Sequence, residues 1–201
     1  MSKAQRITKA DILIALSRSL DLVEGQPPGH AARTCLIAMK IADQLELPEE
    51  QKNDLFFACL LKDAGCSNNS ARIHKIFGGD DFLSKRDVKL IDWSKPINGL
   101  GFAVTHTERG KAWPIKLKRM LGSLGSPTKI MDEVTYARCT RGAEIARMLG
   151  FSSAVSDAVR DLDEHWDGHG SPRHIAGEEI PLRERILCNA QTLEVSVTAS
   201  G

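Results

Sequence analysis

The chain has 201 residues, a length typical of one domain, and its formal net charge of +1 provides no overall field that would attract nucleic acid or an acidic membrane. With 42% hydrophobic and 26% charged residues, it has the composition of a globular protein that buries its own core. No apolar run is long enough to span a bilayer, and residues 1–11 lack the apolar segment of a secretory signal. We therefore expect a cytoplasmic protein with neither a membrane nor a nucleic-acid partner.

Apolar residues recur at helical spacing through the first third of the chain. They predict a helix that follows Thr8 as its N-cap and has an apolar face of Ile12, Leu13, Leu16, Leu20 and Val23. A turn over residues 24–29 leads into a second helix that starts at His30. Pro48 opens a third helix, which ends at Lys62 and Asp63.

The rest of the chain also follows helical patterns, and nowhere does it alternate as a strand does. Helical segments are predicted over residues 67–77, 80–91, 100–107 and 115–121, and the basic run from Lys111 to Arg119 is interpreted as a solvated helix face. A long helix over 128–149 is predicted to break near Gly142. Ser152 or Ser153 is predicted to cap the next helix, and a last helix covers 181–193. The predicted fold class is all-α.

The five cysteines contain no Cys-x-x-Cys pair. Three of them lie in apolar helical patterns, which favours reduced and buried thiols. Cys66 is the exception, because it follows the end of a helix, and we expect it to be exposed.

The candidate site begins with His30 and Asp63. If the second and third helices form an antiparallel pair, the start of one lies near the end of the other, and these two side chains can meet. Two interpretations are open at this point. The pair is half of a metal site, or it is a capping histidine beside a solvated aspartate.

Three segments resemble the HD-GYP branch of the HD-domain phosphohydrolases. They are Gly29-His30-Ala31-Ala32-Arg33, Leu60-Leu61-Lys62-Asp63-Ala64-Gly65 and Glu164-His165-Trp166-Asp167-Gly168-His169-Gly170-Ser171-Pro172. The resemblance implies an HD-domain-like helical bundle with two or three iron or manganese ions, which linearises cyclic di-GMP with a metal-bound hydroxide. It divides the chain into an N-terminal helix (1–28), the helical domain (29–194) and a tail (195–201) that we expect to be truncated.

The chain departs from the family pattern at most positions that would hold metal. His30 and Asp63 match family ligands, but Lys62 and Arg138 stand where the resemblance implies histidines. An ammonium or guanidinium group offers no lone pair to a metal ion. Our hypothesis is that these cations replace the charge of the metal and pair with Asp63. Further family positions fall on Cys66, Leu162, Asp163, Ser171 and near Gln191.

The resemblance also implies the binding residues, which are His30, Arg33, Lys62, Arg138, Glu164 and Asp167. If the chain is active, Lys62 and Asp63 are the catalytic residues, and His30 and Asp63 hold manganese or iron. If it is not, no cofactor is expected. Trp166 is interpreted as a packing anchor for its turn.

We therefore predict a regulatory or binding module in nucleotide signalling of the cyclic di-GMP type. The alternatives are a metal-dependent phosphohydrolase with an altered ligand set and a helical oligomerisation scaffold. The expected partners are a cyclic dinucleotide or another phosphate ligand, together with a partner domain or a second copy of the chain.

Overall fold

The structure is a computed structural model that describes residues 7–66 and 127–200. In these ranges the chain forms six α-helices, one short 3-10 helix (Gly177–Glu179) and no strand. The all-α prediction is confirmed. The α-helices are α1 (Lys9–Val23), α2 (His30–Gln44), α3 (Glu49–Leu61), α8 (Pro127–Met148), α9 (Ser153–Arg160) and α10 (Leu182–Ser200). The helices predicted between residues 67 and 121, and the basic run within them, lie outside the described residues.

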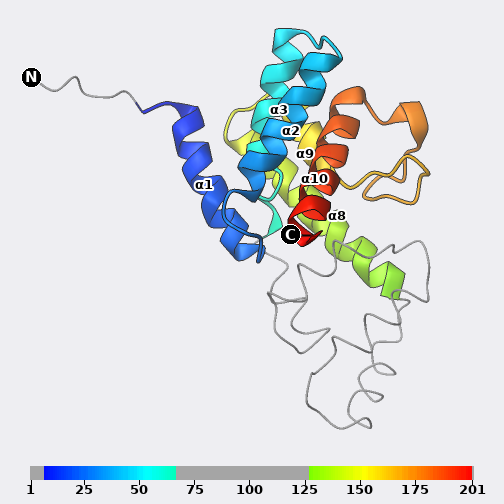
Figure 1. Cartoon of the computed structure of the whole chain (residues 1–201). Coiled ribbons are helices and arrows are strands. Elements are labelled where there is room, and N and C mark those ends of the chain that lie inside the picture. The colour runs from blue at the N-terminus through cyan, green and yellow to red at the C-terminus, as the bar shows by residue number, and fades with distance from the viewer. Residues whose placement is uncertain (1–6, 67–126, 201) are drawn as a thin grey trace, which may run out of the picture.

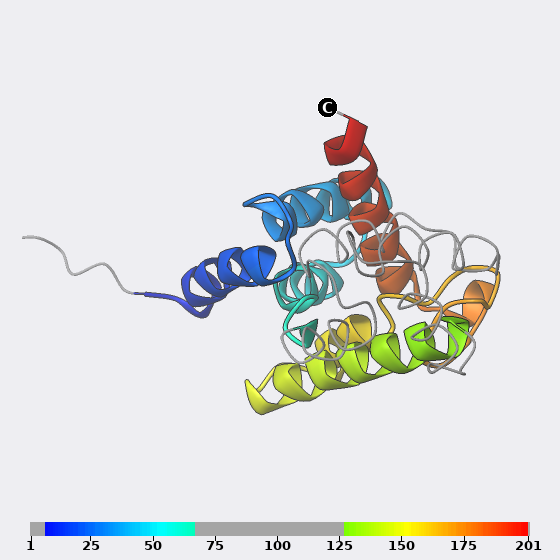
Figure 2. The same cartoon turned by 90° about the horizontal axis from the view of Figure 1, so that it is seen from below.

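Helices α2, α3 and α10 form the centre of the bundle (Figure 1). α2 packs between α3 and α10, α9 packs on α3, and α8 packs on α9. Seen from below, α1 extends away from this bundle, and α8 runs along another edge (Figure 2). The arrangement brings the start of α2 next to the end of α3, as the short connection between them predicts.

The core lies where these central helices meet. Small residues such as Ala38 and Ala42 on α2 and Ala190 on α10 are completely buried, which lets the helices approach closely. Larger side chains fill the space between them, namely Leu55, Leu61, Val155, Leu162 and Leu187. No helix within the described part of the chain has both the length and the apolar content that crossing a membrane requires.

Two predicted helix starts are confirmed in detail. The Thr8 side chain accepts the Asp11 amide while the Asp11 carboxylate accepts the Thr8 amide, which is a capping box. The Ser152 hydroxyl accepts the amide of Val155 at the start of α9.

Three predictions about local structure are wrong. α8 is unbroken at Gly142, because the missing Cβ allows close packing: a Cβ there would lie 2.8 Å from Cγ1 of Val159. The last helix does not end near residue 193, and the predicted tail is helical to Ser200, because Glu194 and Val195 are buried against the bundle. Cys66 is buried rather than exposed, because the turn after α3 packs against the backbone of α8.

Candidate functional site

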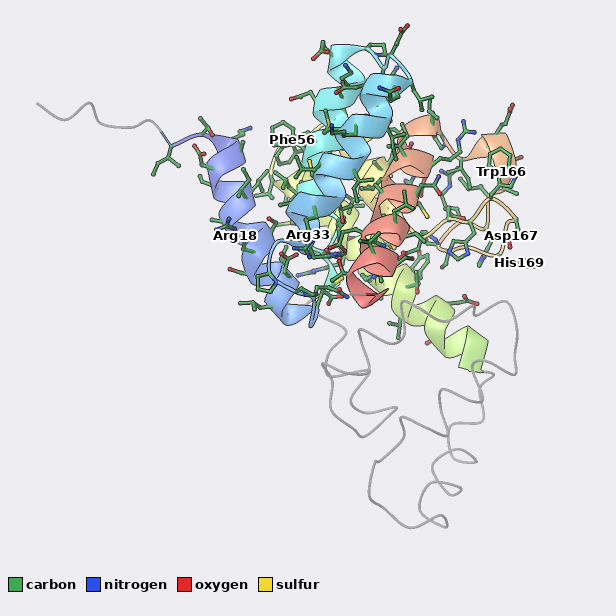
Figure 3. All side chains as sticks on the ribbon, in the orientation of Figure 1. Arg18, Arg33, Phe56, Trp166, Asp167 and His169 are labelled. Carbon is green, nitrogen blue, oxygen red and sulfur yellow. The ribbon has the colours of Figure 1, made fainter. Side chains whose placement is uncertain are left out.

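A buried polar cluster lies where the start of α2, the end of α3 and the last part of α10 come together. We define the His30 cluster as His30, Arg33, Lys62, Asp63 and Glu194. Four of its members are at most 3% exposed, and Arg33 lies at the edge of the cluster (Figure 3). The structure therefore brings together four of the residues named from the sequence and adds Glu194.

His30 is held at both ring nitrogens. Nε2 lies 2.9 Å from the Lys62 ammonium, and Nδ1 contacts the Glu194 carboxylate. An ammonium group can only donate, so Nε2 accepts and the ring proton resides on Nδ1, where it is donated to Glu194. Both nitrogens through which His30 could bind a metal are thus already used.

Lys62 also contacts the carboxylate of Asp63. This is the pairing that the sequence hypothesis predicted for Lys62. The ammonium is fully buried, so its charge is compensated by Asp63 and by the lone pair of His30 rather than by water.

Glu194 connects the cluster to the protein surface. One carboxylate oxygen accepts from Arg33 Nε at 2.7 Å and from the Thr198 hydroxyl at 3.1 Å. The Arg33 side chain is 40% exposed. Burial by itself raises the pKa of Glu194, but the contacts with His30, Arg33 and Thr198 outweigh it and hold that pKa below its ordinary value.

Asp21, at the end of α1, fixes the start of α2. Its two carboxylate oxygens accept the amides of Gly29 at 2.8 Å and Ala31 at 3.1 Å. Gly29 has a φ of 86°, a conformation that glycine adopts readily. Burial raises the pKa of Asp21, and these amide contacts offset part of that shift. α1 therefore positions the helix that carries His30.

Arg138, on α8, supplies a second cation beside the cluster. It forms an ion pair with Asp163. Burial would lower the pKa of its guanidinium, but Cys66, Cys139, Glu24 and Asp63 raise that pKa above the usual value. Since thiols are mostly neutral near pH 7, the carboxylates Glu24 and Asp63 are the charges that face Arg138 there. The ion pair of Arg138 is with Asp163 and not with Asp63 as the hypothesis predicted, although the charge of Arg138 also acts on Asp63.

The backbones of α8 and the turn after α3 touch. A Cβ built on Gly65 would lie 2.0 Å from the carbonyl oxygen of Arg138 and 2.6 Å from the amide nitrogen of Gly142. Only glycine fits at this position. The contact sets how closely Arg138 approaches Asp63.

Comparison with known proteins finds a family that part of the chain resembles. The model of the HD domain family matches residues 102–201. Residues 102–201 are therefore similar to an HD domain. This result agrees with the all-α architecture and with the HD-domain part of the resemblance, and the HD-GYP branch stays a prediction.

Two relatives extend the similarity over nearly the whole chain. A 3'3'-cGAMP-specific phosphodiesterase 3 of Vibrio cholerae is 42% identical over 196 residues, which cover 97% of this chain and 42% of that protein. A crystal structure of a cyclic GMP-AMP specific phosphodiesterase of V. cholerae matches with a TM-score of 0.65 and 37% identity, over 94% of this chain and 41% of that one. The chain therefore spans less than half the length of the relatives it matches.

The cluster holds two of the residues that would bind the metals of an HD domain, His30 and Asp63. Both nitrogens of His30 and one oxygen of Asp63 contact other groups, and Lys62 stands between them as a cation. One other group in the described residues has the composition of a metal site. Ligand atoms of Glu24, Asp63 and Cys66, all buried, lie within 4.8 Å of one another. The charge of Arg138 acts on Glu24 and Asp63 in this group, so a divalent cation bound there would be repelled by a nearby guanidinium. Within residues 7–66 and 127–200, the ligand atoms of His30 and Asp63 are thus engaged by other groups, which does not fit a resident metal centre at that position.

Two of the named binding residues lie away from the His30 cluster. Glu164 is buried and accepts the amides of Arg173 at 2.5 Å and Ile175 at 3.1 Å, which holds the loop after α9 in place. Asp167 is exposed and accepts the amide of His169. Figure 3 shows Asp167 and His169 at the outer edge of this loop.

Trp166, on the same loop, is not the packing anchor that the sequence suggested. Its side chain is 61% exposed, and the Arg185 guanidinium lies 5.4 Å from its ring centre. The loop is held instead by the two Glu164 contacts and by the bond from the Gly177 amide to the Trp166 carbonyl.

Sequence reasoning missed three carboxylates of this region. The sequence pattern gives Asp21 no role, places Glu24 only in the turn after the first helix, and places Glu194 only at the end of the matched region. Glu194 is separated from His30 by 164 positions, so no local pattern could pair them. The available signal was helical spacing. In a helix extended past residue 193, Glu194 shares a face with Leu187 and Ala190, which are both buried.

Proposed function

We propose that the chain is an HD domain of the HD-GYP branch that has lost its hydrolytic metal centre and acts as a regulatory or binding module in cyclic-dinucleotide signalling. One observation carries the proposal: the Lys62 ammonium contacts both His30 and Asp63, the two positions at which the family's metal ligands are kept. A cation fixed at that point excludes a second one by charge repulsion.

The ligand we propose is 3'3'-cGAMP. The sequence resemblance suggested cyclic di-GMP, but the relative from V. cholerae is named for 3'3'-cGAMP. Both molecules contain two phosphodiester groups and two purine bases, so the same binding chemistry serves either. Arg33 supports this assignment, since it is a partly exposed guanidinium at the edge of the His30 cluster and suits a phosphate group.

Two measurements on the same protein test the proposal. The first is hydrolysis of 3'3'-cGAMP and of bis(p-nitrophenyl) phosphate with added manganese or iron. The second is calorimetric binding of 3'3'-cGAMP and of cyclic di-GMP. We expect no turnover beyond that of Asp63→Asn protein, together with saturable binding of 3'3'-cGAMP. Metal-dependent turnover that Asp63→Asn abolishes would overturn the proposal, and so would the absence of binding to either dinucleotide.

The cluster of Glu24, Asp63 and Cys66 favours a second candidate, a phosphohydrolase with an altered ligand set. In that case these three side chains would bind the metal and Arg138 would move aside. Metal analysis after purification in manganese or iron separates the two candidates. A stoichiometric metal that Cys66→Ser removes supports the hydrolase, and a metal-free protein supports the regulatory module.

A further inference from the structure

Helix α1 exposes most of its apolar side chains. Of its large hydrophobic residues, only Leu13 and Leu20 are buried against the bundle. The others are exposed, with Ile12 and Leu22 each 60% accessible, followed by Leu16, Ile14 and Val23. Exposed apolar side chains in this number on one helix favour contact with another protein.

The outward face of α1 has a symmetric order of residues. Asp11, Ile14, Ala15, Arg18 and Leu22 are exposed and recur at steps of three and four, so they share one side of the helix. Asp11 lies three positions before Ile14, and Arg18 lies three positions after Ala15. The acid and the base are thus placed symmetrically about the midpoint between Ile14 and Ala15.

We infer that α1 pairs with α1 of a second copy of this chain, antiparallel, about a two-fold axis between Ile14 and Ala15. In this arrangement Asp11 faces Arg18 of the partner subunit, and the symmetry forms the same pair a second time. Ile14 packs on the partner's Ala15. A parallel pair would instead place like charges opposite one another at both positions, which is unfavourable.

The ends of α1 extend the apolar contact. Leu22 lies opposite the start of the partner helix, near the partner's Ile7, since Ile7 and Leu22 are also equally distant from the midpoint. Ile12, Leu16 and Val23 lie on another side of α1, next to the buried Leu13 and Leu20, and are not part of this contact. Figure 2 shows that α1 extends away from the bundle, so a second α1 can approach it from the side.

Charge exchange between two variants tests this pairing. Wild type, Asp11→Arg, Arg18→Glu and an equimolar mixture of the two variants are examined by sedimentation equilibrium. We expect a wild-type dimer and a dimer dissociation constant raised at least roughly tenfold in each single variant, because like charges then meet twice. In the mixture, the arginine introduced at position 11 of one chain faces the glutamate introduced at position 18 of the other, and the two unchanged residues, Arg18 and Asp11, face each other. A heterodimer therefore forms with near wild-type affinity.

Two controls make the result specific. Asp11→Asn keeps an N3 side chain able to accept the Thr8 amide, so it separates the loss of the capping box from the loss of the ion pair. Arg147→Glu, at an exposed position of α8, makes the same charge change away from the α1 pair and is expected to leave the dimer intact.

A monomeric wild type would overturn the inference, as would single variants that dimerise as well as wild type or a mixture that fails to associate although circular dichroism shows both variants folded. The experiment uses neither metal nor nucleotide. Its failure is therefore distinguishable from failure of the proposed function.

Discussion

Lys62 makes two different contacts with a single ammonium group. One hydrogen goes to the His30 ring and another to the Asp63 carboxylate, and the side chain has no access to water. A buried ammonium is stable only while such partners remain, and the same holds for the buried aspartate. The two charges therefore depend on one another for stability.

Replacing Lys62 by methionine tests that dependence. Methionine has a similar length but no charge, so Asp63 would be left buried without its partner. We expect the free energy of unfolding to fall by about 3–5 kcal/mol, measured by urea denaturation. Lys40→Met, at an exposed position of α2, is the matched control and should change stability by less than about 0.5 kcal/mol. Equal effects of the two substitutions would contradict the structural role of Lys62.

Glu194→Gln should destabilise the protein in a pH-dependent way. The pKa of Glu194 is lowered in the folded protein from an ordinary value of 4.5, so the charged carboxylate stabilises the fold. That contribution is complete above about pH 4.5 and disappears as the pH falls through the lower pKa of the folded state. We expect a loss of roughly 1–3 kcal/mol at pH 7 that shrinks below pH 4.5.

The measurement is urea denaturation of both proteins at several pH values. A difference between wild type and variant that stays constant down to pH 3 would show that the Glu194 carboxylate is not stabilised by its charge.

At the scale of the elements, the passage of α8 past Gly142 depends on packing. Glycine lowers helix propensity, which is why the sequence predicts a break there. The side chain of Val159 on α9 fills the space that a larger residue at 142 would occupy. A tertiary contact has therefore overridden the local preference.

Gly142→Ala should be destabilising although alanine favours helices, because its Cβ would lie 2.8 Å from Cγ1 of Val159. Val159→Ala removes that atom. We expect the two substitutions to be coupled. The loss of unfolding free energy in the double variant should be smaller than the sum of the two single losses by at least about 0.5 kcal/mol. A double-mutant cycle from thermal unfolding measures the coupling, and additive losses would rule the contact out.

For the whole molecule, the sequence predicted the parts that local rules determine. Periodicity placed the described helices, and the antiparallel geometry of α2 and α3 predicted that His30 and Asp63 would meet. The structure brings them to the same cluster through Lys62, which lies 2.9 Å from His30 and contacts Asp63. The contacts made by Asp21, Glu24 and Glu194 depend on how α1, α8 and α10 fold around that pair, which no local pattern specifies. The sequence also did not predict that most apolar side chains of α1 are exposed, because helical periodicity does not specify which of them pack against other helices.

Metal removal should leave the stability of the whole molecule unchanged. A metal bound at 100 times its dissociation constant would stabilise the fold by about 2.7 kcal/mol, enough to raise Tm by several degrees. Lys62 already compensates the charge of Asp63. We therefore expect the same Tm by calorimetry in a chelator and in millimolar manganese. A rise in Tm with manganese that Asp63→Asn abolishes would contradict this expectation.

The contact between Gly65 and α8 has a consequence for the position of the cluster. No side chain separates the two backbones, so the turn that carries Lys62 and Asp63 cannot move closer to α8, and moving away would open a gap in a packed interior. Steric contact between main-chain atoms therefore places this turn, and electrostatics only stabilises it there. Neutral side chains of similar volume at all the charged positions would leave the path of the backbone unchanged.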